Sequence, residues 1–391
     1  MCMEKLNTIN DLFRLKGHQF LNRHPHLKKS AESIVTAIGA CRTAALGGRV
    51  EQCNTCGHKV IRYNSCRNRH CPQCQALKKE KWVLEKSSEL FPFPYFHVVF
   101  TLPDELASLV YHNKRRLYKL LFASVKESLL SMTREEKYFG ARIGFFAILH
   151  TWGQRLNLHP HLHCVVPGGG FSEKKQKWIQ CGSGWIVPNR ALSKRFRSIY
   201  LQALKKIYHQ GELYLKGSEY EAPEDFQGLI DALFQKDWVV YIKETFRHTQ
   251  RVIQYLARYT HRIAISNHRI KKIDAETIEF TFKDYRTGQR KLLTLSHQQF
   301  MGRYLLHILP KGFVRIRYYG LYAHCKKRRC LEEVYAAWGL PVPERRETSE
   351  ASWQEIFQHV LGRQPDCCPN CKKGKLLVVE DLAKRPRSPP G

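Results

Sequence analysis

Two cysteine pairs near the amino terminus constrain this chain more than any other feature. Cys53 and Cys56 form one Cys-x2-Cys pair, and Cys71 and Cys74 form a second after fourteen intervening residues. Four thiolates are a complete ligand set for tetrahedral Zn(II), and Gly57 permits the tight turn that follows such a pair. We therefore predict that these four cysteines bind a structural zinc ion. The alternative is a set of buried or redox-active thiols.

Two further residues with ligand chemistry lie between these pairs. Cys66 and His70 occur in the string NSCRNRHCPQC. They either replace one of the four ligands or form a second site with Cys41 or His58. Residues 36–80 are short, punctuated by glycine and rich in cysteine, as expected of a small domain built around metal.

The charge of the chain indicates its partner. Its 391 residues include 65 Lys and Arg against 34 Asp and Glu, a formal net charge of +31. A nucleic acid neutralises such an excess, and no run of about eighteen apolar residues favours a membrane instead. The start of the chain lacks the apolar run of a signal peptide, so we expect a cytoplasmic protein with metal-bound thiols. Arg67 and Arg69, between the cysteine pairs, are candidate phosphate contacts.

Apolar, β-branched runs alternate with segments of helical period beyond residue 95. We expect strands at 97–103, 144–152, 161–170 and 238–246, a hairpin over 278–295 that turns at Gly288, and helices over 106–132 and 252–262. With 43% hydrophobic residues the chain can bury a sizeable core. The alternation predicts an α/β or α+β sandwich, and we take α+β as the predicted fold class.

The string HPHLHC, residues 159–164, places two histidines on one face of an expected strand. Alternate side chains of a strand share a face, so His161 and His163 point the same way. Two imidazoles are part of a site for a divalent metal. If 144–152 pairs with this strand, Gln154 or His150 lies within reach as a third ligand, and His159 is another candidate. The alternative is a pair of surface histidines.

Two tyrosines lie one helical turn apart in YLARYTHR. Tyr255 and Tyr259, at i and i+4, share one helix face and could each attack a phosphodiester at a single site. Arg258 and Arg262 form a basic pair on the same helix, suited to contact a DNA backbone. The alternative is that both rings are packing residues.

A looser group of cysteines lies near the carboxyl terminus. Cys368 and Cys371 form another Cys-x2-Cys pair that could belong to a second zinc site. The other candidate ligands of this site are Cys325, Cys330, His324 and Cys367. The alternative is a vestigial pair, and the Pro-rich basic tail 383–391 is expected to be disordered.

Five strings together resemble a known family, and they span almost the whole chain. They are CRTAALGG (41–48), NSCRNRHCPQCQ (64–75), HTWGQRLNLHPHLHCVVPGGG (150–170), YLARYTHRIAISNHR (255–269) and LPKGFVRIRYYGL (309–321). The chain resembles the insertion-sequence transposases of the two-tyrosine HUH class, the IS91 type. The resemblance implies a small zinc module at 1–90, an HUH endonuclease domain with a central antiparallel sheet flanked by helices at 95–322, and a basic carboxyl-terminal region at 323–391.

The resemblance implies a chemistry that the residues can support. Mg(II) or Mn(II) on His161 and His163 would polarise a phosphate of single-stranded DNA, and Tyr255 or Tyr259 would attack it to leave a 5′-phosphotyrosine. One ester replaces another, so no nucleotide cofactor is needed, and the chain has no G-x4-G-K-[ST] loop. The implied function is rolling-circle transposition in a bacterial nucleoid. The alternatives are an HUH replication initiator or relaxase, and a non-enzymatic zinc regulator that binds DNA.

Overall fold

An antiparallel sheet of five strands forms the centre of the molecule. The computed structural model describes residues 7–182, 184–246, 264–284, 286–344, 358 and 364–384. The strands of the central sheet follow the order β12 (Ile316–Gly320), β4 (Gly144–Trp152), β5 (Leu158–Pro167), β3 (Tyr95–Thr101) and β8 (Val240–Phe246). Every neighbouring pair is antiparallel. The predicted α+β fold with a central antiparallel sheet is therefore confirmed.

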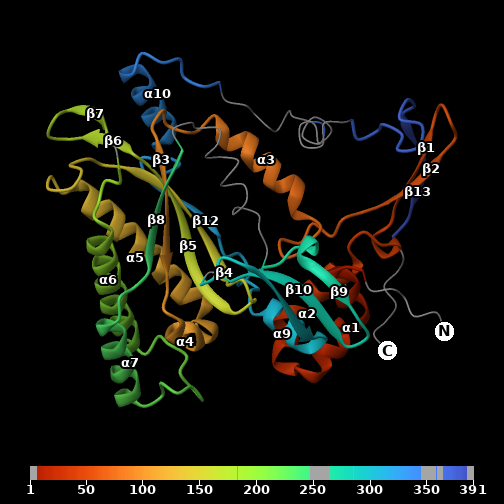
Figure 1. Ribbon diagram of the computed structural model, residues 1–391, viewed down its shortest axis with the longest axis horizontal. Helices are drawn as coiled ribbons and strands as arrows, with labels where there is room; N and C mark the ends of the chain where they lie inside the picture. The colour runs from red at the N-terminus through yellow and green to blue at the C-terminus, as the bar shows by residue number, and fades with distance from the viewer. Residues whose placement is uncertain are drawn as a thin grey trace.

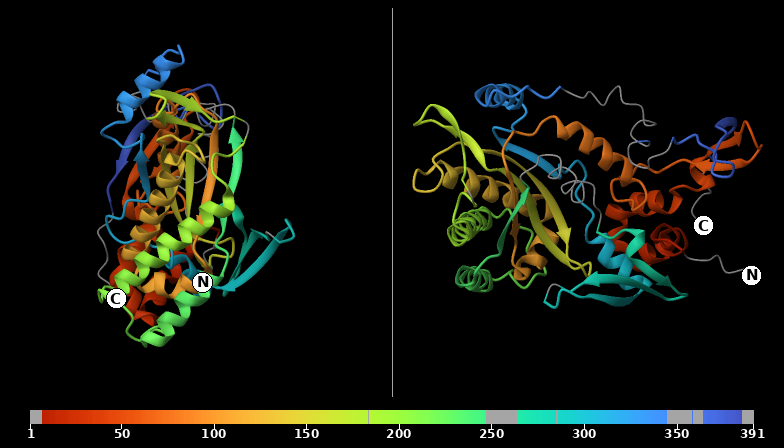
Figure 2. Two further views of the ribbon diagram at one scale, coloured as in Figure 1. Left: turned by 90° about the vertical axis from the view of Figure 1, so that its left-hand side faces the viewer. Right: turned by 45° about the horizontal axis from the view of Figure 1, so that its top comes forward.

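The two faces of this sheet have different coverings (Figure 2). One face carries a helical layer, which consists of α4 (Ala107–His112), α5 (Lys114–Arg134), α6 (Asn189–His209) and α7 (Pro223–Gln235). Phe145, Ala147 and Leu149 of β4 point into this layer and are fully buried. Helix α3 (Gln75–Ser87) packs on the opposite face, where Trp82 contacts Phe146 edge to face at 6.0 Å between ring centroids. Of the described residues, the buried apolar ones on this second face are Trp82, Leu90, Tyr95, Phe146, Ile148 and Val165.

The amino-terminal helices share a core with a second sheet. Helices α1 (Ile9–Arg23) and α2 (Pro25–Ala40) pack against each other, and a capping box between Thr8 and Asp11 begins α1. The second sheet consists of β9 (Ile270–Ile273), β10 (Thr277–Lys283) and β11 (Arg290–Ser296), with α9 (His297–Leu305) beside it. Phe13 of α1 meets Tyr304 of α9 with ring centroids 5.1 Å apart. Strands β10 and β11 form the predicted hairpin.

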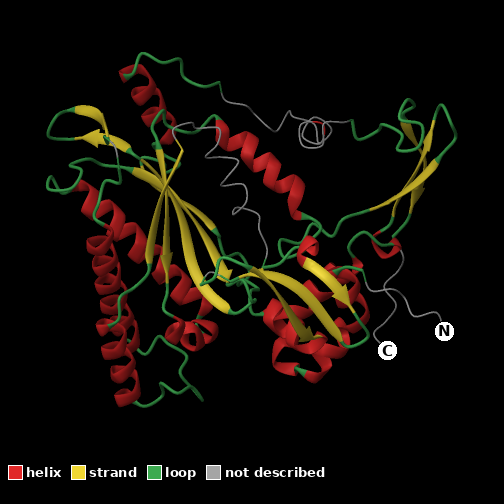
Figure 3. Ribbon diagram, viewed as in Figure 1, coloured by secondary structure: helices red, strands yellow, loops and turns green. Residues whose placement is uncertain are grey.

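A third sheet brings together the two ends of the chain (Figure 3). It contains β1 (Gly48–Cys53), β2 (Lys59–Tyr63) and β13 (Leu376–Leu382), and β13 pairs with β1 along its whole length. A smaller pair, β6 (Gly169–Ser172) and β7 (Lys177–Gln180), follows β5, while α10 (Lys327–Ala337) packs against Phe91 and Phe93. The short 3-10 helices are η1 (Ala44–Leu46), η2 (Asp104–Leu106) and η3 (Asn267–Arg269).

The predicted domain boundaries stay predictions. Packing crosses them, because the zinc module shares its core with residues 264–305 and β13 from the last segment pairs with β1. Among the helices of the described residues, none has the length and apolar character needed to cross a bilayer.

Candidate functional site

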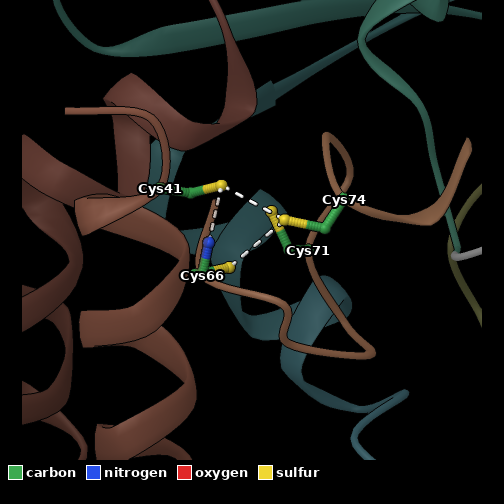
Figure 4. Close-up of side chains that lie close together, drawn as sticks. All are labelled: Cys41, Cys66, Cys71 and Cys74. Atoms are coloured by element: carbon green, nitrogen blue, oxygen red, sulfur yellow. Dashed lines mark hydrogen bonds between the residues drawn. The ribbon is translucent and has the colours of Figure 1, made fainter. Parts of the chain in front are cut away.

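Four cysteines from two parts of the amino-terminal region lie together. This first cysteine cluster consists of Cys41, Cys66, Cys71 and Cys74, whose sulfur atoms all lie within 4.8 Å of one another (Figure 4). The Cys41 and Cys66 sulfurs lie 3.3 and 3.6 Å from the sulfur of Cys74. A tetrahedral ion with Zn–S bonds of about 2.3 Å would hold its sulfurs about 3.8 Å apart. The donor set and its spacing therefore fit Zn(II).

The chain positions these thiols through two local features. Cys41 directly follows α2, and its backbone N–H donates to the carbonyl of Ile38 at 3.2 Å. The other three cysteines lie in the loop between β2 and α3, where Asn10 of α1 donates to the sulfur of Cys71 at 3.4 Å. Hydrogen bonds among these thiols lower the pKa of Cys71 to about 7 and also lower that of Cys74, whereas the hydrogen bond with Cys41 raises the pKa of Cys66.

A second cysteine cluster combines residues from both ends of the chain. It consists of Cys53, Cys56, Cys368 and Cys371, again with all sulfur atoms within 4.8 Å of one another. The prediction that Cys53, Cys56, Cys71 and Cys74 form one site is therefore wrong. Cys71 and Cys74 belong to the first cluster, and Cys53 and Cys56 belong to the second. The physical reason is β2, a strand that runs from Lys59 back to Tyr63 and carries the chain away from the first cysteine pair before the second pair begins.

The other predicted ligands have different surroundings. Cys330 is buried on α10 among the rings near Phe91, and Cys325 is exposed, so neither joins a cysteine cluster. Cys367 bonds backbone carbonyls instead of a neighbouring sulfur. His70 lies in a small cavity lined also by His307, where burial lowers its pKa to about 3.

Replacing Cys71 with Ser should remove the zinc ion of the first cluster. Metal binding contributes on the order of 10 kcal/mol to the folding of such small modules, so the loop between β2 and α3 should unfold locally. We expect metal analysis of the variant to show one zinc ion fewer per chain and DNA-end binding to weaken. Cys325→Ser is the matched control, because this exposed cysteine lies in neither cluster. Equal zinc content in both variants would contradict the assignment.

Three histidines meet on the face of the central sheet opposite the helical layer. His150 of β4 lies directly across from His161 of β5, and His163 follows on the same face. Their rings each offer a nitrogen, and the three ligand atoms lie within 4.8 Å of one another. His150 and His163 are buried, while His161 is half-buried. Three imidazoles with one partly open side are a typical donor set for a catalytic divalent metal.

Hydrogen bonds fix the orientation of two of these rings. The Nδ1 atom of His161 lies 2.7 Å from the carbonyl oxygen of His159, and that of His163 lies 2.8 Å from Nε2 of His97. Nε2 is therefore the nitrogen that each ring would offer to a metal. Burial, with a smaller effect of Lys243, lowers the pKa of His97 to about 4, so this ring is neutral and its Nε2 can accept a hydrogen bond from Nδ1–H of His163.

The three candidates for the third ligand have different surroundings in the structure. His150 joins the pair, whereas His159 bonds the Asp104 carboxylate at 3.0 Å. Gln154, the preferred candidate, lies in the turn after β4, where its side-chain oxygen accepts from the backbone N–H of Lys283 at 3.5 Å. His97 was missed by sequence reasoning. The available signal was its position in the run 97–103, a predicted strand. When this strand pairs with β5, His97 lies on the same face as the other histidines.

The remaining predicted residues are two tyrosines and four arginines. Tyr255, Tyr259, Arg258 and Arg262 lie outside the described residues, so their roles stay predictions. Arg67 is exposed and adopts a left-handed backbone with φ of 53°. Arg69 donates to the backbone carbonyl of Phe313 at 3.0 Å, which ties the zinc loop to the segment before β12.

Two family models match the chain. Residues 12–102 match the family model described as "Transposase zinc-binding domain", and residues 144–329 match the model described as "Putative transposase". No solved structure matches the chain significantly.

Two curated relatives cover most of the chain. A protein of Sinorhizobium fredii named "Putative transposase y4qJ" is 42% identical over 377 residues, which are 95% of this chain and 94% of the relative. The transposase for insertion sequence element IS801 of Pseudomonas savastanoi is 30% identical over 325 residues, which are 79% of this chain and 74% of the relative. The amino-terminal zinc-binding module and the histidine-bearing sheet thus belong together in one kind of protein, and the chain is a member of the IS91-type family of insertion-sequence transposases.

Proposed function

We propose that this transposase cuts one strand of DNA through a tyrosine, keeps the 5′ end as a phosphotyrosine, and transfers it to a new 3′-hydroxyl. The observation that carries the proposal is the convergence of His150, His161 and His163 on the half-open face of the central sheet. Mg(II) or Mn(II) bound there would draw charge from the scissile phosphate and make the phosphorus easier to attack. The histidines hold and orient that centre, and the hydrogen bond from His163 to His97 keeps its ring in place.

The tyrosines supply the nucleophile in this proposal. The phenol oxygen of Tyr255 or Tyr259 forms a bond to phosphorus, the bond from phosphorus to the 3′-oxygen breaks, and the phenol proton ends on that 3′-oxygen. One phosphodiester replaces another, so the step is reversible and needs no nucleotide. Two tyrosines allow one to hold a donor strand while the other opens a second site, which suits rolling-circle movement of a single strand.

A strand-specific cleavage assay tests the proposal. Oligonucleotides from the DNA that flanks the gene are incubated with the protein and Mg(II) or Mn(II), as single strands and as duplexes, and run on denaturing gels. We expect cleavage of single strands, with a 3′-labelled strand becoming protein-bound and a 5′-labelled strand released with a free 3′-hydroxyl. Protein linked to the 5′-labelled fragment, or two products without protein, would contradict a 5′-phosphotyrosine.

The same assay separates this function from its alternatives. A non-enzymatic zinc regulator would bind these strands and cut none of them, and it would leave the histidine cluster without a role. A replication initiator or relaxase shares the chemistry, but both curated relatives are named transposases. A transposase gene should lie between fixed element ends, and its protein should join those ends to a target strand.

A further inference from the structure

The second cysteine cluster links residues more than three hundred positions apart. The sulfur atoms of Cys53 and Cys371 lie 3.7 Å apart, as do those of Cys56 and Cys368. A disulfide would hold two sulfurs at about 2.05 Å, whereas a tetrahedral zinc tetrathiolate holds them at about 3.8 Å. We propose that this cluster binds a second structural zinc ion, distinct from that of the amino-terminal module, and that this ion fixes the carboxyl-terminal strand to the amino-terminal hairpin.

The two cysteine pairs of this cluster have the same backbone geometry. The N–H of Gly57 donates to the carbonyl of Cys53 at 3.1 Å, and the N–H of Lys372 donates to the carbonyl of Cys368 at 3.0 Å. Gly57 and Lys372, each four residues after the first cysteine of its pair, adopt left-handed backbones with φ of 70° and 58°. Two stretches of chain that are far apart in the sequence thus form the same turn, and the sulfur atoms of their four cysteines lie together.

Backbone N–H groups also point at the sulfur atoms. Cys56 donates to the sulfur of Cys53 at 3.5 Å, and Gly374 donates to the sulfur of Cys371 at 3.3 Å. Such donors stabilise thiolates, which is the form that binds zinc. A Cβ at Gly374 would lie 2.4 Å from the sulfur of Cys53, so the backbone of the second pair approaches the first as closely as glycine allows.

Among the described residues, the third sheet has only a small apolar core. Its buried cluster contains Leu376 besides Cys53 and Cys368, with Val60 and Cys371 partly buried. Four other apolar side chains of this sheet are 52–55% exposed: Ile61, Leu377, Val378 and Val379. Three short strands without a hydrophobic face are marginal in water, and small domains of this kind depend on a metal or a disulfide. The cysteines of this sheet therefore provide the cross-link that its apolar residues do not.

Zinc counting on the full-length protein tests this inference. We expect two zinc ions per chain in the wild type, one in Cys371→Ser, one in Cys71→Ser and none in the double variant. Cys325→Ser should retain two, and Cys371→His should restore the second ion because imidazole is also a zinc ligand. A wild-type protein with one zinc ion that Cys371→Ser keeps would overturn the inference, as would a disulfide between these cysteines in the mass spectrum.

A second experiment measures the link between the ends and does not require a variant of the cysteines. A protease sequence inserted within 345–357 allows the chain to be cut between α10 and β13. We expect the fragment that carries β13 to stay with the rest of the protein during gel filtration and to separate when a chelator removes the metal. Separation before chelation, or retention after complete loss of zinc, would contradict the proposed role.

Discussion

Replacing both Tyr255 and Tyr259 with Phe should abolish the covalent protein–DNA adduct. Phenylalanine keeps each ring and removes only the oxygen that would bond to phosphorus, so the loss should be complete although the protein still folds. The measurement is the gel-shifted, protease-sensitive band formed with a 3′-labelled single strand. We expect each single variant to lose transposition, with one of them retaining cleavage of an isolated oligonucleotide.

The matched control for these variants is Tyr214→Phe. Tyr214 is 57% exposed and contacts Asn113 through its backbone, away from the histidine cluster. This variant should form the adduct as the wild type does. A double variant that still yields the adduct would show that Tyr255 and Tyr259 are packing residues and that another group is the nucleophile.

Replacing His161 or His163 with Ala should reduce cleavage by more than about 100-fold while DNA affinity stays nearly unchanged. Losing a partner of a metal ligand already costs about 10- to 100-fold, and losing a ligand removes one of three donors. Because the chain has a net charge of +31, we expect affinity to come mainly from Lys and Arg contacts with phosphates, so it should fall steeply with salt in the variants and the wild type alike.

Two additional variants sharpen this test. His150→Ala should cause the same loss, because its ring is the third donor, whereas His209→Ala at the end of α6 should have no effect. A chelator should stop cleavage by the wild type, and added Mn(II) should restore it. Full cleavage by the His161 and His163 variants, or cleavage indifferent to the chelator, would remove the metal from the proposed function.

Much of the fold was predictable because its signals are local. The run 144–152 became β4 with the same bounds, and the period-two pattern of HPHLHC correctly placed His161 and His163 on one face of β5. Alternation along a strand is a property of the backbone, so it can be read without knowing the neighbours. The hairpin of β10 and β11 could also be predicted, because its turn residues are a local signal that does not depend on the neighbouring strands.

The third donor of the histidine cluster could not be chosen from the sequence. His150, Gln154 and His159 are all close to the pair along the chain, and only the register of β4 against β5 puts His150 opposite His161. A shift of that register by one residue would have turned His150 toward the helical layer. His97 likewise joined the site through the pairing of β3 with β5.

By itself the sequence determined the cysteine pairs, the histidine pair and the family, because each depends on neighbouring residues and on strings of side chains in order. Only the tertiary structure decided which cysteine pairs lie together. Cys53 and Cys56 meet Cys368 and Cys371, not the pair that follows fourteen residues later. The physical reason is that closing a loop costs free energy that grows only with the logarithm of its length, so a distant pair competes well with a near one. Strand direction then distinguishes the two pairs, since β2 leads away from the hairpin tip, whereas β13 begins beside that tip, shortly after Cys368 and Cys371.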